Sequence, residues 1–362
     1  MIAGQISPRT RFHRLAAPFP LECGASLPEV VVAYRTWGSL RREDSRAILV
    51  CHALTGSADA DAWWPALFGP GRLLDPARHF IVCSNVLGSC YGTTGPLSPS
   101  PHGNGPWGPD FPPVTIRDMV RLQRELLAAL GVRRLELVLG GSLGGMQALE
   151  WIVTFPELVE KAAVIAAPAR HSAWATALSE AQRAAIRADT RFRDGRYSLA
   201  EPPRDGLAAA RMVAMCTYRS PAGLTARFGR ELTRDGSFAV EAYLRAHGEK
   251  LVARFDANAY ITLTRAMDSH DVARGRGPYV EVLRTITTPL LLLAIDSDVL
   301  YPLPELTALA REIPGARLQI LASPHGHDAF LVEGEAVERA IRAFADSVAG
   351  ASGGAAGGVQ CA

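Results

Sequence analysis

Short runs of apolar or strand-forming residues recur along the chain, each flanked by turn residues, and such runs are typical of buried strands. They lie at residues 47–51, 80–83, 135–139, 162–167, 289–295 and 317–321. Helical periodicity separates several of them, most clearly after Thr115, which is expected to be an N-cap, and it continues until Gly131. Because buried strands alternate with helices, the pattern predicts an α/β fold with a mostly parallel central sheet.

One long stretch interrupts this alternation. Between about 171 and 285 the pattern changes to several amphipathic helices rich in Ala and Arg, without a convincing run of buried strands. We therefore expect a helical lid inserted into the α/β core. The expected parts are the first part of the core (1–170), the lid (171–285), the second part of the core (286–349) and a disordered Gly/Ala-rich tail (350–362). Residues 1–20 are predicted to be a loosely attached lead-in, followed by an early strand pair between 21 and 33.

A glycine-rich turn joins the strand predicted at 135–139 to a helix and carries a serine at its apex. The pattern Gly140-x-Ser142-x-Gly144 is that of a nucleophile elbow, in which glycines allow a strained backbone that exposes the hydroxyl. The helix that follows directs its N-terminus at the same place, where it would stabilise an oxyanion. A plain Gly-rich turn or a phosphate-binding loop is the alternative. The phosphate-binding loop is disfavoured because the lysine of a P-loop and the G-x-G-x-x-G spacing of a dinucleotide site are missing.

A serine hydroxyl becomes a good nucleophile only when a base takes its proton and an acid orients that base. In enzymes with this turn, the acid and then the histidine follow the serine along the chain. The loop after the strand at 289–295 offers Asp298, which we prefer because it lies farther into the loop than the alternative, Asp296. The loop after the last predicted strand offers His327 as the base, preferred over His325 because it enters the next helix.

An oxyanion hole requires two converging backbone N–H donors. One is expected from Leu143, the residue after the serine, and the other from Leu54, in the loop that follows the strand at 47–51. Ligands of α/β sheets gather at such carboxyl ends of strands. The side chain of His52 is expected to support this loop and not to take part in the chemistry.

Composition narrows the class of protein. With 38 Lys and Arg against 36 Asp and Glu, the charges are too balanced to indicate a nucleic-acid partner. The six cysteines are scattered without a C-x-x-C pair, so neither a metal site nor a disulfide framework is indicated. No run approaches about eighteen uninterrupted apolar residues, and the N-terminal segment lacks the apolar centre of a signal peptide. We therefore expect no membrane span and a cytoplasmic protein.

With these residues assembled, the sequence resembles the homoserine O-acetyltransferase family of α/β-hydrolase-fold enzymes. The resemblance extends from about residue 10 to residue 345 and is carried by many stretches in the family's order. They include 52–56, 63–64, 84–96, 108–112, 115–119, 140–151, 218–220, 254–260, 298–302 and 326–331. One departure is Leu143, where the family usually has methionine, and this apolar change conserves volume and should not disturb the backbone donor.

The resemblance implies a role for each candidate residue. Ser142 would accept the acyl group, Asp298 would orient His327, and His327 would act as the base. It also points to Arg211 and Asp328 as contacts for the amino-acid substrate, and a zwitterion does need a cation for its carboxylate and an anion for its ammonium group.

The implied reaction is a ping-pong acetyl transfer from acetyl-CoA to L-homoserine, which gives O-acetyl-L-homoserine for methionine biosynthesis and uses no bound cofactor. Relatives are usually homodimers that pair through lid helices. Succinyl-CoA as donor, L-serine as acceptor, and an esterase that uses water stay open as alternatives, because the same triad serves each of them. A non-catalytic binding protein is disfavoured by the intact triad.

Overall fold

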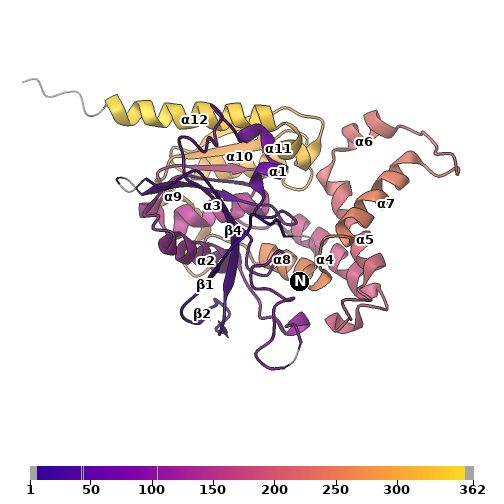
Figure 1. The fold of residues 1–362 in the computed structure, drawn as a ribbon. Coiled ribbons are helices and arrows are strands. Elements are labelled where there is room, and N and C mark those ends of the chain that lie inside the picture. Colours follow the sequence, from indigo (N-terminus) through magenta and orange to yellow (C-terminus); the bar gives the residue numbers. More distant parts are fainter. Residues whose placement is uncertain (1–5, 42, 44, 104, 355–362) are drawn as a thin grey trace, which may run out of the picture.

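A mostly parallel β-sheet forms the centre of the protein, of which the computed structural model describes residues 6–41, 43, 45–103 and 105–354 (Figure 1). Within these residues the sheet has eight strands in the order β1-β4-β6-β5-β7-β8-β9-β10. In that order they are Arg11–Arg14, Val31–Trp37, Ile81–Ser84, Arg46–Cys51, Arg134–Gly141, Ala162–Ile165, Leu290–Ile295 and Arg317–Leu321. All neighbours from β6 to β10 pair in parallel, whereas β4 is antiparallel to both β1 and β6. The predicted mostly parallel sheet is confirmed.

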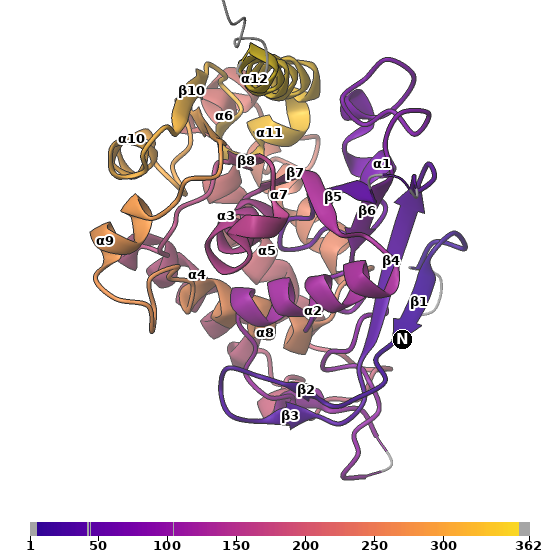
Figure 2. The same ribbon diagram turned by 90° about the vertical axis from the view of Figure 1, so that its left-hand side faces the viewer.

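Both faces of the central strands are buried. Successive residues of each strand point to opposite sides of the sheet, and helices cover each side. In β5, Leu49 belongs to one hydrophobic cluster and Ile48 to the other. The helices that contribute to the first cluster include α2 (Ile116–Ala129), α3 (Leu143–Thr154), α9 (Tyr279–Arg284) and α10 (Leu303–Glu312). Those of the second are α1 (Ala60–Trp63), α11 (Ala329–Val332) and α12 (Gly334–Gly354). Figure 2 labels these three helices at the top and upper right of the molecule. This layering explains why the central strands read as continuous apolar runs.

A helical insertion separates β8 from β9 in the chain, although these two strands pair directly in the sheet. Besides α9 it contains α4 (Ala173–Ala188), α5 (Arg204–Tyr218), α6 (Pro221–Phe228), α7 (Ala239–Val252) and α8 (Ala257–Asp268). Figure 1 shows α6 and α7 at the right-hand edge of the molecule, whereas α8 lies nearer the sheet. The insertion contributes Ile186, Leu207 and Leu251 to the same cluster as Leu49, so the insertion and the sheet share one core.

Two details near the chain ends differ from the sequence prediction. The lead-in predicted to be loosely attached is wrong in part, because β1 pairs with β4 over Arg11–Arg14. The early strand pair predicted between 21 and 33 is also wrong in part, because that stretch holds β3 (Ser26–Leu27) and the start of β4, and β3 pairs with β2 (Phe19–Pro20), which precedes the stretch. α12 continues through 350–354, the first residues of the predicted tail, and 355–362 lie outside the described residues. No helix in the described part of the chain combines the length and apolar character needed to cross a membrane.

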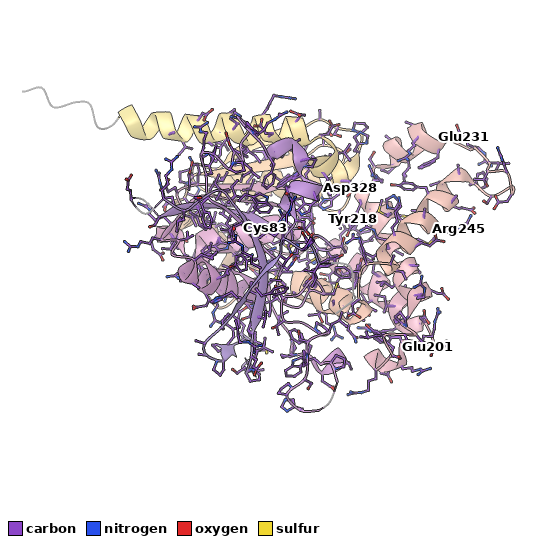
Figure 3. All side chains as sticks on the ribbon, in the orientation of Figure 1. Cys83, Glu201, Tyr218, Glu231, Arg245 and Asp328 are labelled. Carbon is purple, nitrogen blue, oxygen red and sulfur yellow. The ribbon has the colours of Figure 1, made fainter. Side chains whose placement is uncertain are left out.

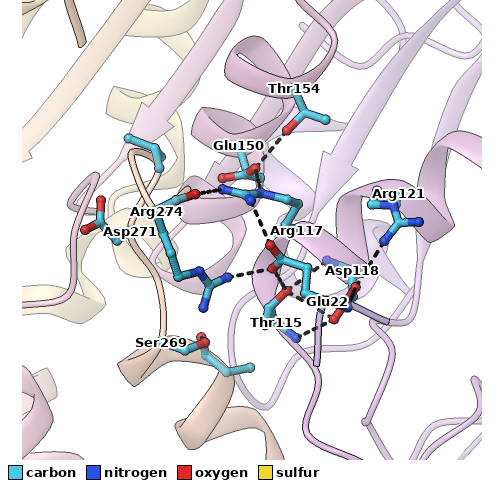
Figure 4. A network of polar contacts seen from close by, with 12 residues as sticks. Glu22, Thr115, Arg117, Asp118, Arg121, Glu150, Thr154, Ser269, Asp271 and Arg274 are labelled. Atoms are coloured by element: carbon cyan, nitrogen blue, oxygen red, sulfur yellow. Dashed lines mark hydrogen bonds and ion pairs between the residues drawn. The ribbon is translucent and has the colours of Figure 1, made fainter. Parts of the chain in front are cut away.

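A buried ion network fixes α3 from the side opposite its N-terminus (Figure 4). Glu150 of α3 is 2% exposed and accepts hydrogen bonds from Arg117 Nε at 2.8 Å and Arg276 at 2.6 Å. Glu22 accepts from the same Arg117 at 2.7 Å and from Arg274 at 2.6 Å. Burial acts to raise the pKa of the Glu150 carboxyl, but the two arginines lower it below its usual value. The helix that begins beside Ser142 is thus tied to α2, to the N-terminal segment and to the segment after α8.

Candidate active site

The predicted sharp turn around Ser142 is confirmed. β7 ends at Gly141 and α3 begins at Leu143, and Ser142 between them has φ 56° and ψ −123°, a left-handed backbone that residues other than glycine rarely adopt. The glycines of the pattern are needed for space. A Cβ on Gly144 would lie 2.1 Å from the carbonyl oxygen of Cys51, and one on Gly140 would lie 2.4 Å from backbone of the first helical turn. The first turn of α3 therefore packs directly against the end of β5.

Asp298 and His327 come together from the loops after β9 and β10. His327 Nδ1 lies 2.7 Å from Asp298 Oδ2, and both side chains are almost fully buried. The other oxygen of Asp298 accepts hydrogen bonds from the backbone N–H groups of Leu300 at 2.8 Å and Tyr301 at 3.0 Å. Since the carboxylate is held on both oxygens, it fixes the orientation of the imidazole and the position of its Nδ1 proton.

The two alternatives have other partners. Asp296 accepts a hydrogen bond from the backbone N–H of Ser323 at 3.0 Å, so it braces the loop after β10. His325 is 40% exposed at its side chain, and its Nε2 lies 3.8 Å from Glu333. The structure therefore joins the preferred pair and leaves the alternatives out of it.

His327 sits among aromatic rings. Its ring centroid lies 5.7 Å from that of Tyr218, 5.3 Å from Tyr301 and 5.6 Å from Phe330. Its Nε2 is buried and has no hydrogen-bond partner within the described residues, so no such bond joins it to Ser142 Oγ. Phe330 packs against both His327 and the Ser142 turn, because a Cβ on Gly141, next to Ser142, would lie 2.6 Å from the Phe330 ring. Without substrate, the hydrogen bond between a histidine base and its nucleophile is often long or poorly aligned, so this geometry is compatible with the predicted role of His327.

The side chain of His52 supports the loop that carries Leu54, as predicted. The Nδ1 of this fully buried histidine lies 2.8 Å from the carbonyl oxygen of Ala53, and its Nε2 accepts a hydrogen bond from Val86 N–H at 3.1 Å. Burial lowers the pKa of His52 to about 4, so the ring stays neutral and Nδ1 carries the proton. The backbone N–H groups of Leu54 and Leu143 donate no hydrogen bond within the described part of the chain. Both are therefore free to bind an oxyanion.

The predicted substrate contacts lie at the junction of the inserted helices and the core. Arg211 of α5 places its guanidinium 5.0 Å from the ring centroid of Tyr218, the same ring that packs on His327. Asp328 is paired with Arg219, whose Nε lies 3.4 Å from its Oδ2. Figure 3 labels Tyr218 and Asp328 at this junction. Burial raises the pKa of the Asp328 carboxyl, although Arg219 and the other nearby cations oppose the rise.

Sequence reasoning missed Arg219 and Tyr218 as individual residues of the site. They belong to the stretch 218–220, which the family resemblance had already marked, but nothing in the local pattern indicated a contact with Asp328 or His327. The signal would have been the stretch itself, since the resemblance singled out Tyr218, Arg219 and Ser220 at the end of one inserted helix.

A cavity of about 810 Å³ opens beside the Leu54 loop and has the size of a small-molecule site. Its wall includes Ala53, Thr55, Trp63, Tyr91, Arg211 and Arg254. It thus joins the predicted oxyanion loop to the predicted carboxylate contact. No group of three or more His, Cys, Asp or Glu side chains that could hold a metal ion occurs among the described residues.

Comparison with known proteins agrees with this geometry. The family model of the alpha/beta hydrolase fold matches residues 46–334. A homoserine O-acetyltransferase of Chloroherpeton thalassium is 56% identical over 338 residues, which cover 93% of this chain and 89% of that protein. Among solved structures, the homoserine O-acetyltransferase from Staphylococcus aureus is 29% identical with a TM-score of 0.75, covering 92% of this chain and 94% of that one. Esterase E22 is 26% identical with a TM-score of 0.85, covering 93% and 99%. At such identity over nearly its whole length, the chain belongs to the homoserine O-acetyltransferase family within the alpha/beta hydrolase fold.

Proposed function

We propose that the protein transfers an acetyl group from acetyl-CoA to the hydroxyl of L-homoserine and so forms O-acetyl-L-homoserine for methionine biosynthesis. One observation carries the proposal. The strained Ser142 turn and the hydrogen-bonded Asp298–His327 pair occur in a chain that is 56% identical to a homoserine O-acetyltransferase. The mechanism that follows needs no bound cofactor and no metal ion.

The first half-reaction would acylate Ser142. His327, whose Nδ1–H donates a hydrogen bond to Asp298 and stays in place, takes the proton of Ser142 Oγ on Nε2 while Oγ attacks the thioester carbonyl carbon. The N–H groups of Leu54 and Leu143 stabilise the tetrahedral oxyanion. When this intermediate collapses, the carbon–sulfur bond breaks, and coenzyme A leaves as a thiol with the proton that His327 returns.

The second half-reaction would transfer the acyl group to the amino acid. Arg211 binds the homoserine carboxylate and Asp328 its ammonium group, which brings the hydroxyl toward the acyl-serine. His327 takes the hydroxyl proton while the oxygen attacks the ester carbonyl. The intermediate then releases Ser142, whose Oγ recovers a proton from His327.

Water is the competing acceptor, and the likeness to esterase E22 makes hydrolysis the second candidate function. The two functions share the triad and differ only in what the pocket admits. Arg211 lines the cavity, and the largely buried Asp328 lies close enough to feel the charge of Arg211, so the two offer opposite charges that favour an amino acid over water as the acceptor. A succinyl donor and a serine acceptor are the alternatives within the same fold. We further propose a homodimer that pairs through the inserted helices and a cytoplasmic location.

The decisive test is a mass measurement of the purified protein after mixing with acetyl-CoA alone. We expect the protein to gain one acetyl group, located on the peptide that contains Ser142. Adding L-homoserine should remove this acetyl label and form O-acetylhomoserine. Ser142→Ala should remain unlabelled. Parallel reactions with succinyl-CoA and with L-serine test the other donor and acceptor. Loss of the label at the same rate without any amino acid would identify an esterase instead.

A further inference from the structure

Arg254 connects the inserted helices to the loop that carries Leu54. It lies between α7 and α8 and is partly buried. One guanidinium nitrogen donates hydrogen bonds to the Thr55 carbonyl oxygen at 2.7 Å and to Tyr91 Oη at 2.5 Å, and the other donates to Thr55 Oγ1 at 3.3 Å. Thr55 and Arg254 are 199 residues apart in the chain. No carboxylate among the described residues forms an ion pair with Arg254, and its guanidinium hydrogen bonds go to Thr55 and Tyr91.

The contact at Thr55 is relayed to the Leu54 N–H through two peptide groups. The first peptide group joins Thr55 to Gly56. Its carbonyl oxygen accepts the hydrogen bond from Arg254, and its N–H donates to the Ala53 carbonyl oxygen at 2.8 Å. The second carries that Ala53 carbonyl and the Leu54 N–H. Because a trans peptide is planar, its C=O and N–H point in opposite directions, and fixing one fixes the other. The direction of the Leu54 N–H is therefore set by hydrogen bonds that begin at Arg254.

We propose that Arg254 is a positioning residue for the oxyanion hole, which holds the Leu54 N–H in the direction of the developing negative charge. His52 fixes the Ala53 carbonyl, and Arg254 fixes the Thr55 carbonyl, two residues farther along the loop, from the side of the insertion. The inference rests on the proposed function, in which Leu54 donates to the oxyanion. It also gives the inserted helices a part in catalysis that the triad alone does not require.

The surroundings of Arg254 suit this role. Tyr91 packs edge-on against Phe255 at 5.6 Å between ring centroids, and its phenol accepts the hydrogen bond from Arg254. Burial raises the pKa of Tyr91 to about 12, so the phenol stays neutral. A planar guanidinium can hold Thr55 and Tyr91 at fixed relative positions, whereas a lysine ammonium offers no such fork.

The test compares Arg254→Met and Arg254→Lys with the unchanged protein in single-turnover acylation by acetyl-CoA. We expect Arg254→Met to acylate about tenfold to a hundredfold more slowly, with KM for acetyl-CoA within about twofold, because a misdirected donor weakens transition-state binding and not ground-state binding. Arg254→Lys should recover part of the rate. Added guanidinium ion should restore part of the rate of Arg254→Met through the adjacent cavity.

Two further variants test whether the effect is specific to the Arg254 contacts. Tyr91→Phe keeps the ring and removes one acceptor, so it should fold and show a smaller loss of rate in the same direction. Arg284→Met is the control, because Arg284 belongs to the insertion and pairs with Glu312 at 3.1 Å, and its rate should not change. Circular dichroism and the thermal midpoint check folding in each case.

A second substrate separates failure of this inference from failure of the proposed function. Hydrolysis of p-nitrophenyl acetate passes through the same oxyanion and does not depend on coenzyme A. If the unchanged protein reacts with this ester and not with acetyl-CoA, the proposed function is wrong, and the ester reaction still measures the effect of Arg254. Equal rates for Arg254→Met, Tyr91→Phe and the unchanged protein would overturn the inference. So would a raised KM with an unchanged acylation rate, which would make Arg254 a ligand contact.

Discussion

At the scale of single residues, burial and neighbouring charges act on the pKa of His327 in opposite directions. Burial lowers the pKa of its imidazole, but the charge and hydrogen bond of Asp298, together with the charge of Asp328, outweigh burial and raise the pKa above its usual value. Backbone N–H groups hold the second oxygen of Asp298, so the pair cannot relax by rotation. In the proposed mechanism, His327 is therefore a stronger base that also becomes protonated, and thus inactive, at a higher pH than a free imidazole.

We therefore expect the acylation rate to fall as pH is lowered through the raised pKa of His327, because only the neutral ring can accept the Ser142 proton. Asp298→Asn should move this acid limb to lower pH and reduce the plateau rate by about 10⁴-fold, since the amide favours the wrong tautomer. The measurement is single-turnover release of coenzyme A from about pH 5 to 9.

Asp328→Asn is the matched variant for this prediction. It removes a charge near His327 without touching the Asp298 hydrogen bond, so the limb should shift in the same direction and by less. Acylation contains no amino acid, so any loss of homoserine binding cannot influence the result. An acid limb that stays in place in both variants would contradict the assignment of His327 as the base.

The sequence located the residues whose position follows from local pattern. Asp298 and His327 follow two apolar strands, and their depth in the loops was enough to prefer them over their neighbours. The pairing of Asp328 with Arg219 and the reach of Arg254 to Thr55 were not predicted. These contacts join segments about a hundred or two hundred residues apart, and hydrophobic periodicity says nothing about which distant loops meet.

At the scale of elements, the tightest constraint is the packing of α3 against β5. Gly144 has no room for a side chain because the Cys51 carbonyl lies where its Cβ would be. The same approach brings the first N–H groups of α3 to the loop that carries Leu54. In the proposed mechanism these N–H groups form the oxyanion hole, and this close packing of two backbones requires a glycine at position 144.

Gly144→Ala should destabilise the protein by more than about 3 kcal/mol, because backbone would have to move to admit the methyl group. Gly103→Ala is the control, since nothing lies within 4 Å of a Cβ at that position, and its stability should stay within about 0.5 kcal/mol. Urea denaturation followed by circular dichroism measures both. Equal midpoints for the two variants would show that the turn is more adaptable than its geometry indicates.

Elements were predictable where burial imposed a pattern. β5, β7, β8 and β9 are buried on both faces, and their apolar runs marked them clearly. β1 has a mostly exposed and polar sequence, because it is an edge strand whose backbone pairs with β4 while its side chains face solvent. A strand stabilised mainly by backbone hydrogen bonds leaves no hydrophobic period in the sequence.

At the scale of the whole molecule, the insertion divides into a buried and an outlying part. α8 has buried residues along most of its length and shares the core of the sheet. By contrast, α6 has no buried residue, and in α7 only Gly248 and Leu251 are buried. Figure 1 shows these two helices farthest from the sheet. The outlying pair therefore buries few side chains within one chain.

Hydrogen exchange should reveal this division. At low protein concentration, the amides of α6 and of the first turns of α7 should exchange at least about tenfold faster than those of α8, because local opening costs less where few apolar contacts break. If the protein is a homodimer that pairs through the inserted helices, protection of α6 and α7 should rise with protein concentration while that of α8 and α2 stays constant. Uniform protection across the insertion at low concentration would contradict the division. Protection of α6 and α7 that never responds to concentration would remove these helices from the dimer proposal, because a second copy that covered them would slow their opening by mass action.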